Sequence, residues 1–260
     1  MTPTAAPCAS CGAALTGPYC SRCGQRERAH RLTLGSVGAD ALRQATSLDR
    51  GLGRTLLDLA RRPADVAADY WRGRTAPYAP PVRFFLVMVT VVQVATFALG
   101  LAPDFVESFA EGFDSARRTG AEAVDTEAML GNVRRFWVVG LAGLVPFAAF
   151  WSRVVFRGAG RTLAEHAVAH LYFMGFFVLA LGVSIFGGHA LYEVAEWVGD
   201  AFALVTFVGA VGLYLWSVAG AFGRGRWTGL AGALAVFVLT YGGYVVAWGI
   251  VAGIRSAHGG

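Results

Sequence analysis

The chain has 260 residues, of which 55% are hydrophobic and only 15% are charged. This composition excludes an ordinary soluble globular protein and indicates an integral membrane protein. The net charge of +5 is uneven, because residues 1–83 contain twelve Arg and six acidic residues, whereas residues 84–260 contain ten Arg and eleven acidic residues. The basic excess therefore precedes the first apolar run, where anionic lipid headgroups are the expected partner. The Arg residues alternate with acids and form no dense basic run, which argues against nucleic-acid binding.

The first candidate site along the chain is a group of four cysteines in the spacing C-x2-C-x8-C-x2-C. They are Cys8, Cys11, Cys20 and Cys23. Two residues between paired cysteines allow one tight turn to aim both sulfurs at a single ion. Gly12 and Gly24 each follow a pair, at a position where such a turn often needs a positive φ. The pattern predicts a zinc ribbon with a structural Zn²⁺, because four thiolates leave no open position for a catalytic water.

A disulfide pair and a redox motif are the alternatives for these cysteines. Residues 1–31 contain no apolar run, so a secretory signal peptide is not expected, and a cytoplasmic head favours metal over disulfide. Residues 1–31, the ribbon and a short charged tail, form the first predicted unit.

Residues 32–82 form the second predicted unit, a cytoplasmic region of amphipathic helices and a Pro-rich linker. Asp49 is a candidate N-cap, and Pro63 is expected to end one helix and begin the next. Residues 76–81 contain three prolines and should not be helical. The aromatic residues near this linker suit a membrane interface; they are Tyr70, Trp71 and Tyr78.

Residues 83–260 form the third unit and contain five apolar runs. The runs cover about residues 84–101, 136–156, 168–186, 201–222 and 230–254. Each is close to the ~20 residues that a helix needs to cross hydrocarbon. Soluble core helices are the alternative, but five such runs in one chain argue against them. We therefore predict an all-α integral membrane protein with about five transmembrane helices, preceded by the ribbon and the amphipathic helices.

The placement of arginine predicts the orientation of these spans. Loop 102–135 carries seven acids and four Arg, and connection 187–200 carries three acids and no Arg, so both are expected outside. The Arg-rich first 83 residues and two short connections are expected inside; these connections contain Arg153, Arg157 and Arg161, and Arg224 and Arg226. The prediction is a bacterial inner-membrane protein with a cytoplasmic N-terminus and a periplasmic C-terminus.

A second candidate site begins the third span at Glu165, His166 and His170. The two histidines are four residues apart, so they share a helix face. Ionisable groups at a membrane boundary are candidates for a metal, proton or headgroup site. The alternative is interface anchoring and hydrogen bonding to neighbouring helices. The chain contains neither a P-loop nor a G-x-S-x-G motif.

The order of motifs resembles the bacterial domain-of-unknown-function 3667 family over residues 8–85. The segments that carry the resemblance are C-A-S-C-G at 8–12, Y-C-S-R-C-G-Q at 19–25, L-D-R-G at 48–51, T-L at 55–56, R-P at 62–63, Y-W-R-G-R at 70–74 and Y-A-P at 78–80. The E-H…H segment from Glu165 to His170 also has a counterpart there. The resemblance implies a zinc-ribbon membrane protein and brings no activity.

Three functions are open at this point. The favoured one is a non-enzymatic binding, scaffolding or regulatory protein, whose ribbon recruits a cytoplasmic protein. The second is a membrane-embedded enzyme or a lipid or small-molecule carrier that uses Glu165, His166 and His170. A nucleic-acid-binding ribbon ranks last, because Tyr19, Arg22 and Arg26 are its only suitable side chains.

Overall fold

A computed structural model describes residues 7–25, 33–36, 51–101 and 143–258. Apart from the ribbon, this part of the chain is helical. In chain order its helices are α2 (Leu52–Arg61), α3 (Pro63–Trp71), α4 (Pro81–Ala98), an unlabelled helix over Gly143–Val155 (helix 143–155), the short 3-10 helix η1 (Arg157–Ala159), α7 (Leu163–Tyr192), α8 (Glu196–Phe222) and α9 (Arg226–His258).

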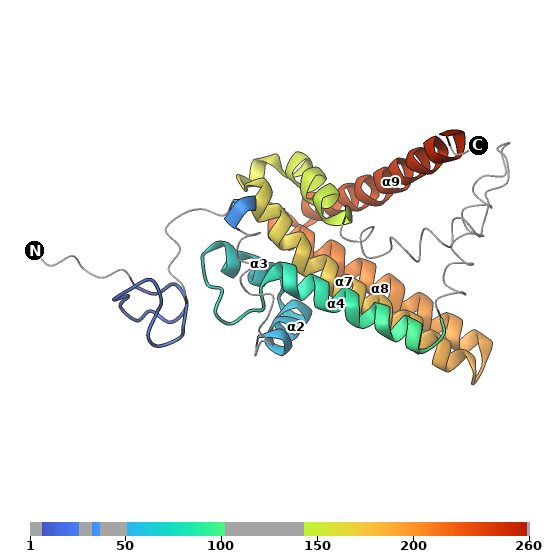
Figure 1. The fold of residues 1–260 in the computed structure, drawn as a ribbon, viewed down its shortest axis with the longest axis horizontal. Coiled ribbons are helices and arrows are strands. Elements are labelled where there is room, and N and C mark those ends of the chain that lie inside the picture. The colour runs from blue at the N-terminus through green and yellow to red at the C-terminus, as the bar shows by residue number, and fades with distance from the viewer. Residues whose placement is uncertain (1–6, 26–32, 37–50, 102–142, 259–260) are drawn as a thin grey trace, which may run out of the picture.

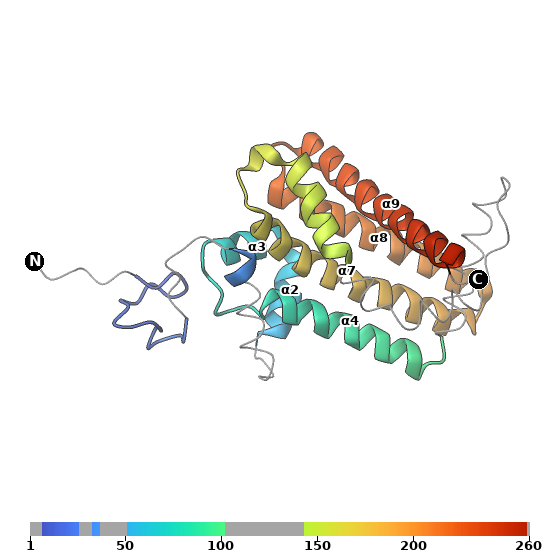
Figure 2. The same ribbon diagram turned by 45° about the horizontal axis from the view of Figure 1, so that its top comes forward.

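Helix α7 is the centre of the bundle. It packs against α8 along its length and against α4 on another side, and α8 in turn packs against α9. Figures 1 and 2 show α4, α7 and α8 running side by side, with α2 and α3 at one end. In its most apolar 18-residue stretch 61% of the residues of α7 are buried, against 28% in α4 and 22% in α8. The described residues therefore leave most of the apolar surface of α4 and α8 uncovered.

Three described helices are long and apolar enough to cross a membrane, namely α4, α7 and α8. Their bounds differ from the predicted runs because apolar composition does not locate a helix end. Helix α4 begins at Pro81 rather than at residue 84, since Pro suits the first helical position. Helix α7 is 30 residues long and α8 is 27, so both extend beyond the runs at 168–186 and 201–222.

The remaining two predicted runs are described less completely. The run at 136–156 corresponds to helix 143–155, and residues 136–142 lie outside the described residues. The run at 230–254 falls within α9. Loop 102–135 and Asp49 also lie outside the described residues, and the N-cap of α2 is Gly51.

The amphipathic helices α2 and α3 bury their apolar faces in protein. Leu59, Val66 and Ala67 are fully buried, and both helices contact α7. The predicted break at Pro63 is confirmed, because α2 ends at Arg61 and α3 begins at Pro63. These helices therefore cover one end of the helix bundle.

Two of the three aromatic residues that were expected to suit a membrane interface, Tyr70 and Tyr78, are covered by protein. Tyr70 and Tyr78 are almost completely buried, and Tyr70 meets the ring of Tyr172 edge-on at 5.9 Å. The Tyr78 hydroxyl donates to Asp69 at 3.0 Å. Burial, with this carboxylate as neighbour, raises the pKa of Tyr78 to about 12. Amphipathicity showed that an apolar face exists but not that protein covers it.

The Pro-rich linker between α3 and α4 is held by side chains from other elements. The Thr55 hydroxyl of α2 accepts the Ala79 N–H at 2.9 Å and donates to the Gly51 carbonyl at 2.8 Å. The Tyr172 hydroxyl of α7 donates to the Ala79 carbonyl at 2.6 Å. Thr55, Ala79 and Tyr172 are all fully buried. The linker is thereby fixed to both α2 and α7.

We expect Thr55→Val to lower the free energy of unfolding by about 1–3 kcal/mol, because it leaves the buried Ala79 N–H without an acceptor. Thermal unfolding of the detergent-solubilised protein measures the change. Thr90→Val on the exposed face of α4 is the matched control and should be nearly neutral. Equal melting temperatures for the two variants would contradict the role given to Thr55.

Candidate metal centre

The four cysteines converge as the sequence predicts. Their sulfurs all lie within 4.8 Å of one another. The Cys8 and Cys23 sulfurs are 3.6 Å apart, and those of Cys11 and Cys20 are 3.5 Å apart. A tetrahedral ion with bonds of 2.3 Å to sulfur requires separations of about 3.8 Å. The group could therefore hold one metal ion with small adjustments.

Two matching turns position these sulfurs. In the first, the Gly12 N–H donates to the Cys8 carbonyl at 2.9 Å, and in the second the Gly24 N–H donates to the Cys20 carbonyl at 2.9 Å. Gly12 and Gly24 have φ values of 74° and 71°, in the left-handed region that favours glycine. The prediction that each pair is followed by a residue with positive φ is confirmed.

The electrostatics of the group favour a bound cation. Backbone N–H groups of Cys23 and Arg22 lower the pKa of the Cys20 thiol to about 6. The Gln25 N–H lowers the pKa of Cys23, but burial and the three neighbouring thiols raise it to about 12. The first thiol thus ionises easily, whereas further thiolates repel one another unless a cation balances them.

The ribbon is attached to the linker through Gln25, which directly follows the second turn. Its amide oxygen accepts the N–H groups of Thr75 at 3.0 Å and Ala76 at 2.8 Å. Its amide nitrogen donates to the Thr75 hydroxyl at 2.9 Å. Gln25 is only 4% exposed, so these bonds are shielded from water. The ribbon is therefore docked onto the region before α4.

The second candidate site is brought together only in part. Glu165 closes the N-terminus of α7: its carboxylate accepts the Thr162 N–H at 2.8 Å, and its own N–H donates to the Thr162 hydroxyl at 3.2 Å. Arg161 lies 3.8 Å from the same carboxylate. Among the described residues only the four cysteines form a convergent group of three or more metal-binding side chains. Glu165 thus caps a helix and does not converge with the two histidines.

His166 and His170 are fully buried inside the bundle. Nδ1 of His166 lies 2.8 Å from the Ser152 hydroxyl of helix 143–155, and Nδ1 of His170 lies 3.1 Å from the Tyr214 hydroxyl of α8. In the described part of the chain neither Nε2 has a hydrogen-bond partner. The ring of Phe222 stacks on His166 at 4.2 Å. Sequence reasoning missed Ser152 and Tyr214, since both lie on other helices and nothing in their local sequence marks them as partners of the histidines.

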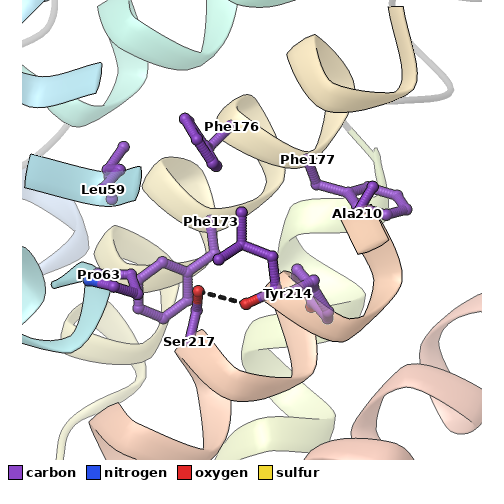
Figure 3. Close-up of a pocket in the computed structure, with 9 residues that line it drawn as sticks. Leu59, Pro63, Phe173, Phe176, Phe177, Ala210, Tyr214 and Ser217 are labelled. Carbon is purple, nitrogen blue, oxygen red and sulfur yellow. Dashed lines mark hydrogen bonds between the residues drawn. The ribbon is translucent and has the colours of Figure 1, made fainter. Parts of the chain in front are cut away.

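The packing beside these histidines leaves no room for a ligand at the junction of α2, α3, α7 and α8. Figure 3 shows the side chains that meet there, including Leu59, Pro63, Phe177 and Tyr214. Their surfaces enclose no space large enough for a water molecule. This junction is a packed core.

Part of the chain matches a known family. Residues 49–92 match the family described as Protein of unknown function (DUF3667). The match confirms the resemblance noted in the sequence, over α2, α3 and most of α4, and it contains the buried linker. The ribbon and the histidines lie outside the matched residues. Searches of curated proteins and of solved structures gave no match.

We expect the purified protein to carry about one metal ion per chain, and replacement of Cys20 and Cys23 by Ser to remove it, because two ligands cannot hold a closed site. Elemental analysis of the full-length protein measures this. Gln25→Ala is the matched variant, which should keep the ion while exposing the Thr75 and Ala76 amides to hydrogen exchange. Metal retained by the Cys→Ser variant would place an ion elsewhere, with His166 and His170 as the first candidates.

Proposed function

We propose that this is a multi-pass bacterial inner-membrane protein with a non-enzymatic binding, scaffolding or regulatory role, and that the ion in its ribbon is a structural Zn²⁺. The observation that carries this proposal is the closed set of four sulfurs on a ribbon docked by Gln25. A closed site offers no position for a catalytic water. Because the ribbon is docked, its orientation is fixed and the same face is always exposed to solvent.

That face carries the side chains suited to a protein partner. Tyr19 is 60% exposed, and Arg22 is exposed beside it in the second cysteine pair. Tyrosine and arginine are enriched among the residues that contribute most to protein interfaces. We propose that this face binds a cytoplasmic protein.

A photo-crosslinking amino acid at Tyr19 tests this role in cells. We expect a discrete protein adduct that disappears when Cys20 and Cys23 are replaced by Ser, because the face is folded around the ion. The same crosslinker at Leu57, which is exposed on α2, is the matched control. No adduct at Tyr19, or the same adduct at both positions, would refute recruitment through the ribbon.

We also propose five spans with the N-terminus inside and the C-terminus in the periplasm. The arginines of the two predicted inner connections support this, because Arg224 donates to the Gly158 carbonyl and so lies against η1. Arg161 in turn lies over the ring of Trp71, at 4.2 Å from its centroid. Through these contacts the two Arg-containing connections lie close to each other, and the first of them contacts α3.

A reporter fused after Gly260 tests the topology. An enzyme active only in the periplasm should be active there, whereas a reporter active only in the cytoplasm should be silent. The reverse result would exclude five spans with the N-terminus inside. Paired reporters inserted at Ser36, before α2, give the opposite expected pattern and serve as the control.

The second candidate function is a membrane-embedded enzyme or a lipid or small-molecule carrier that uses Glu165, His166 and His170. One observation favours it: two buried Nε2 atoms have no hydrogen-bond partner among the described residues, and each belongs to a ring that a hydroxyl orients. Glu165 counts against it, since its carboxylate is engaged by Thr162. The metal content of the Cys→Ser variant separates the two candidates. An ion retained without the cysteines would favour a site at the histidines, and complete loss of metal would favour the ribbon alone.

A further inference from the structure

A cavity lies where η1 meets the turn between α8 and α9. Its volume is about 220 Å³, enough for about seven waters. The apolar part of its wall includes Val155, Phe156 and Phe222. Gly232 completes this wall, and a Cβ there would lie 2.6 Å from the Phe156 ring, so only glycine lets the ring sit where it does. The packing of helix 143–155 and η1 against α8 and α9 therefore forms the cavity.

The polar part of the wall is basic. Arg224 and Thr228 line the cavity and are both exposed. The Arg224 guanidinium uses one of its five donors on the Gly158 carbonyl, and no described carboxylate forms an ion pair with it. Helix α9 begins at Arg226, two residues after Arg224, and the start of a helix attracts anions. These groups together suit a phosphate.

The position of the cavity relative to the membrane indicates where such a phosphate comes from. The apolar helix α8 ends at Phe222, one residue before the turn. Trp227 is 78% exposed on the first turn of α9, and the Arg226 guanidinium lies 5.8 Å from its ring. Exposed Trp and Arg at the end of a span are typical of the headgroup layer. In the topology proposed above, on which this inference rests, the cavity would open at the depth of lipid phosphates.

We propose that this cavity binds an anionic phospholipid, with its phosphate at Arg224 and Thr228 and the start of an acyl chain against Phe156 and Phe222. The cavity is too small for a whole lipid, so most of the chain would remain in the bilayer. The proposal adds a specific site to the expected contact with anionic headgroups, far along the sequence from α2 and α3. It does not depend on the role proposed for the ribbon.

Native mass spectrometry of the full-length protein in detergent, titrated with dioleoyl-phosphatidylglycerol, tests this. We expect Arg224→Gln to weaken binding about tenfold, because it removes a charge-assisted hydrogen bond to the phosphate. Thr228→Phe should weaken binding as much by filling the cavity, and its exposed position leaves the fold intact. Arg157→Gln removes an exposed charge from η1 that does not line the cavity, and it should have little effect.

Several results would overturn the proposal. An equal loss with Arg157→Gln would show diffuse attraction to surface charge, and unchanged binding by Thr228→Phe would place the headgroup outside the cavity. Equal binding of dioleoyl-phosphatidylcholine would remove the preference for an anionic lipid. Displacement of the lipid by millimolar inorganic phosphate would identify free phosphate as the ligand. Arg224→Gln removes the hydrogen bond to the Gly158 carbonyl and could lower the melting temperature. In that case the effect of Thr228→Phe on lipid binding alone tests the proposal.

Discussion

The buried, Pro-rich linker before α4 imposes a requirement that three other elements meet, because its backbone cannot satisfy itself. Backbone polar groups that leave water must find partners, and a segment rich in proline cannot supply them through helix or sheet. Here they come from outside: Thr55 of α2 and Tyr172 of α7 hold Ala79, and Gln25 of the ribbon holds Thr75 and Ala76. Three elements far apart in sequence are thereby fixed by one short segment. The family match at residues 49–92 covers this segment together with α2 and α3.

This arrangement gives α2 and α3 a different role from the one that their composition suggests. Both helices contact α7, and α3 also contacts α8, while the carboxylates of Asp58 and Asp69 are engaged by neighbouring side chains. Asp58 lies 3.0 Å from Arg62; burial raises the pKa of the Asp58 carboxyl, but the hydrogen bond and charge of Arg62 lower it below its usual value. Asp69 accepts the Tyr78 hydroxyl. The pair of helices is thus a rigid cover for one end of the bundle, and the docked ribbon extends that cover into the solvent.

The sequence predicts best where the determinants are local. The spacing of the cysteines and the two glycines that follow them define the ribbon turns, and Pro63 defines the break between α2 and α3. The role of Glu165 was also readable, because T-x-x-E from Thr162 is the pattern of a capping box. What could not be predicted depends on distant partners: whether protein or lipid covers an apolar face, and which hydroxyls orient His166. The attachment of Gln25 to the linker likewise could not be predicted, because it joins segments that are far apart in the sequence.

The cover and the proposed lipid site are in physical contact through Trp71. Its indole N–H donates to the Glu165 carbonyl at 3.0 Å, and its ring lies 5.5 Å from that of Phe222, which lines the cavity. Contact alone does not establish energetic coupling, which requires an element with two arrangements. Trp71 contacts both Arg161 and Phe222, and Phe222 is itself stacked on His166. Direct contacts therefore join α3 to the cavity wall. The partner proposed for the ribbon and the lipid proposed for the cavity would nevertheless bind at separate places.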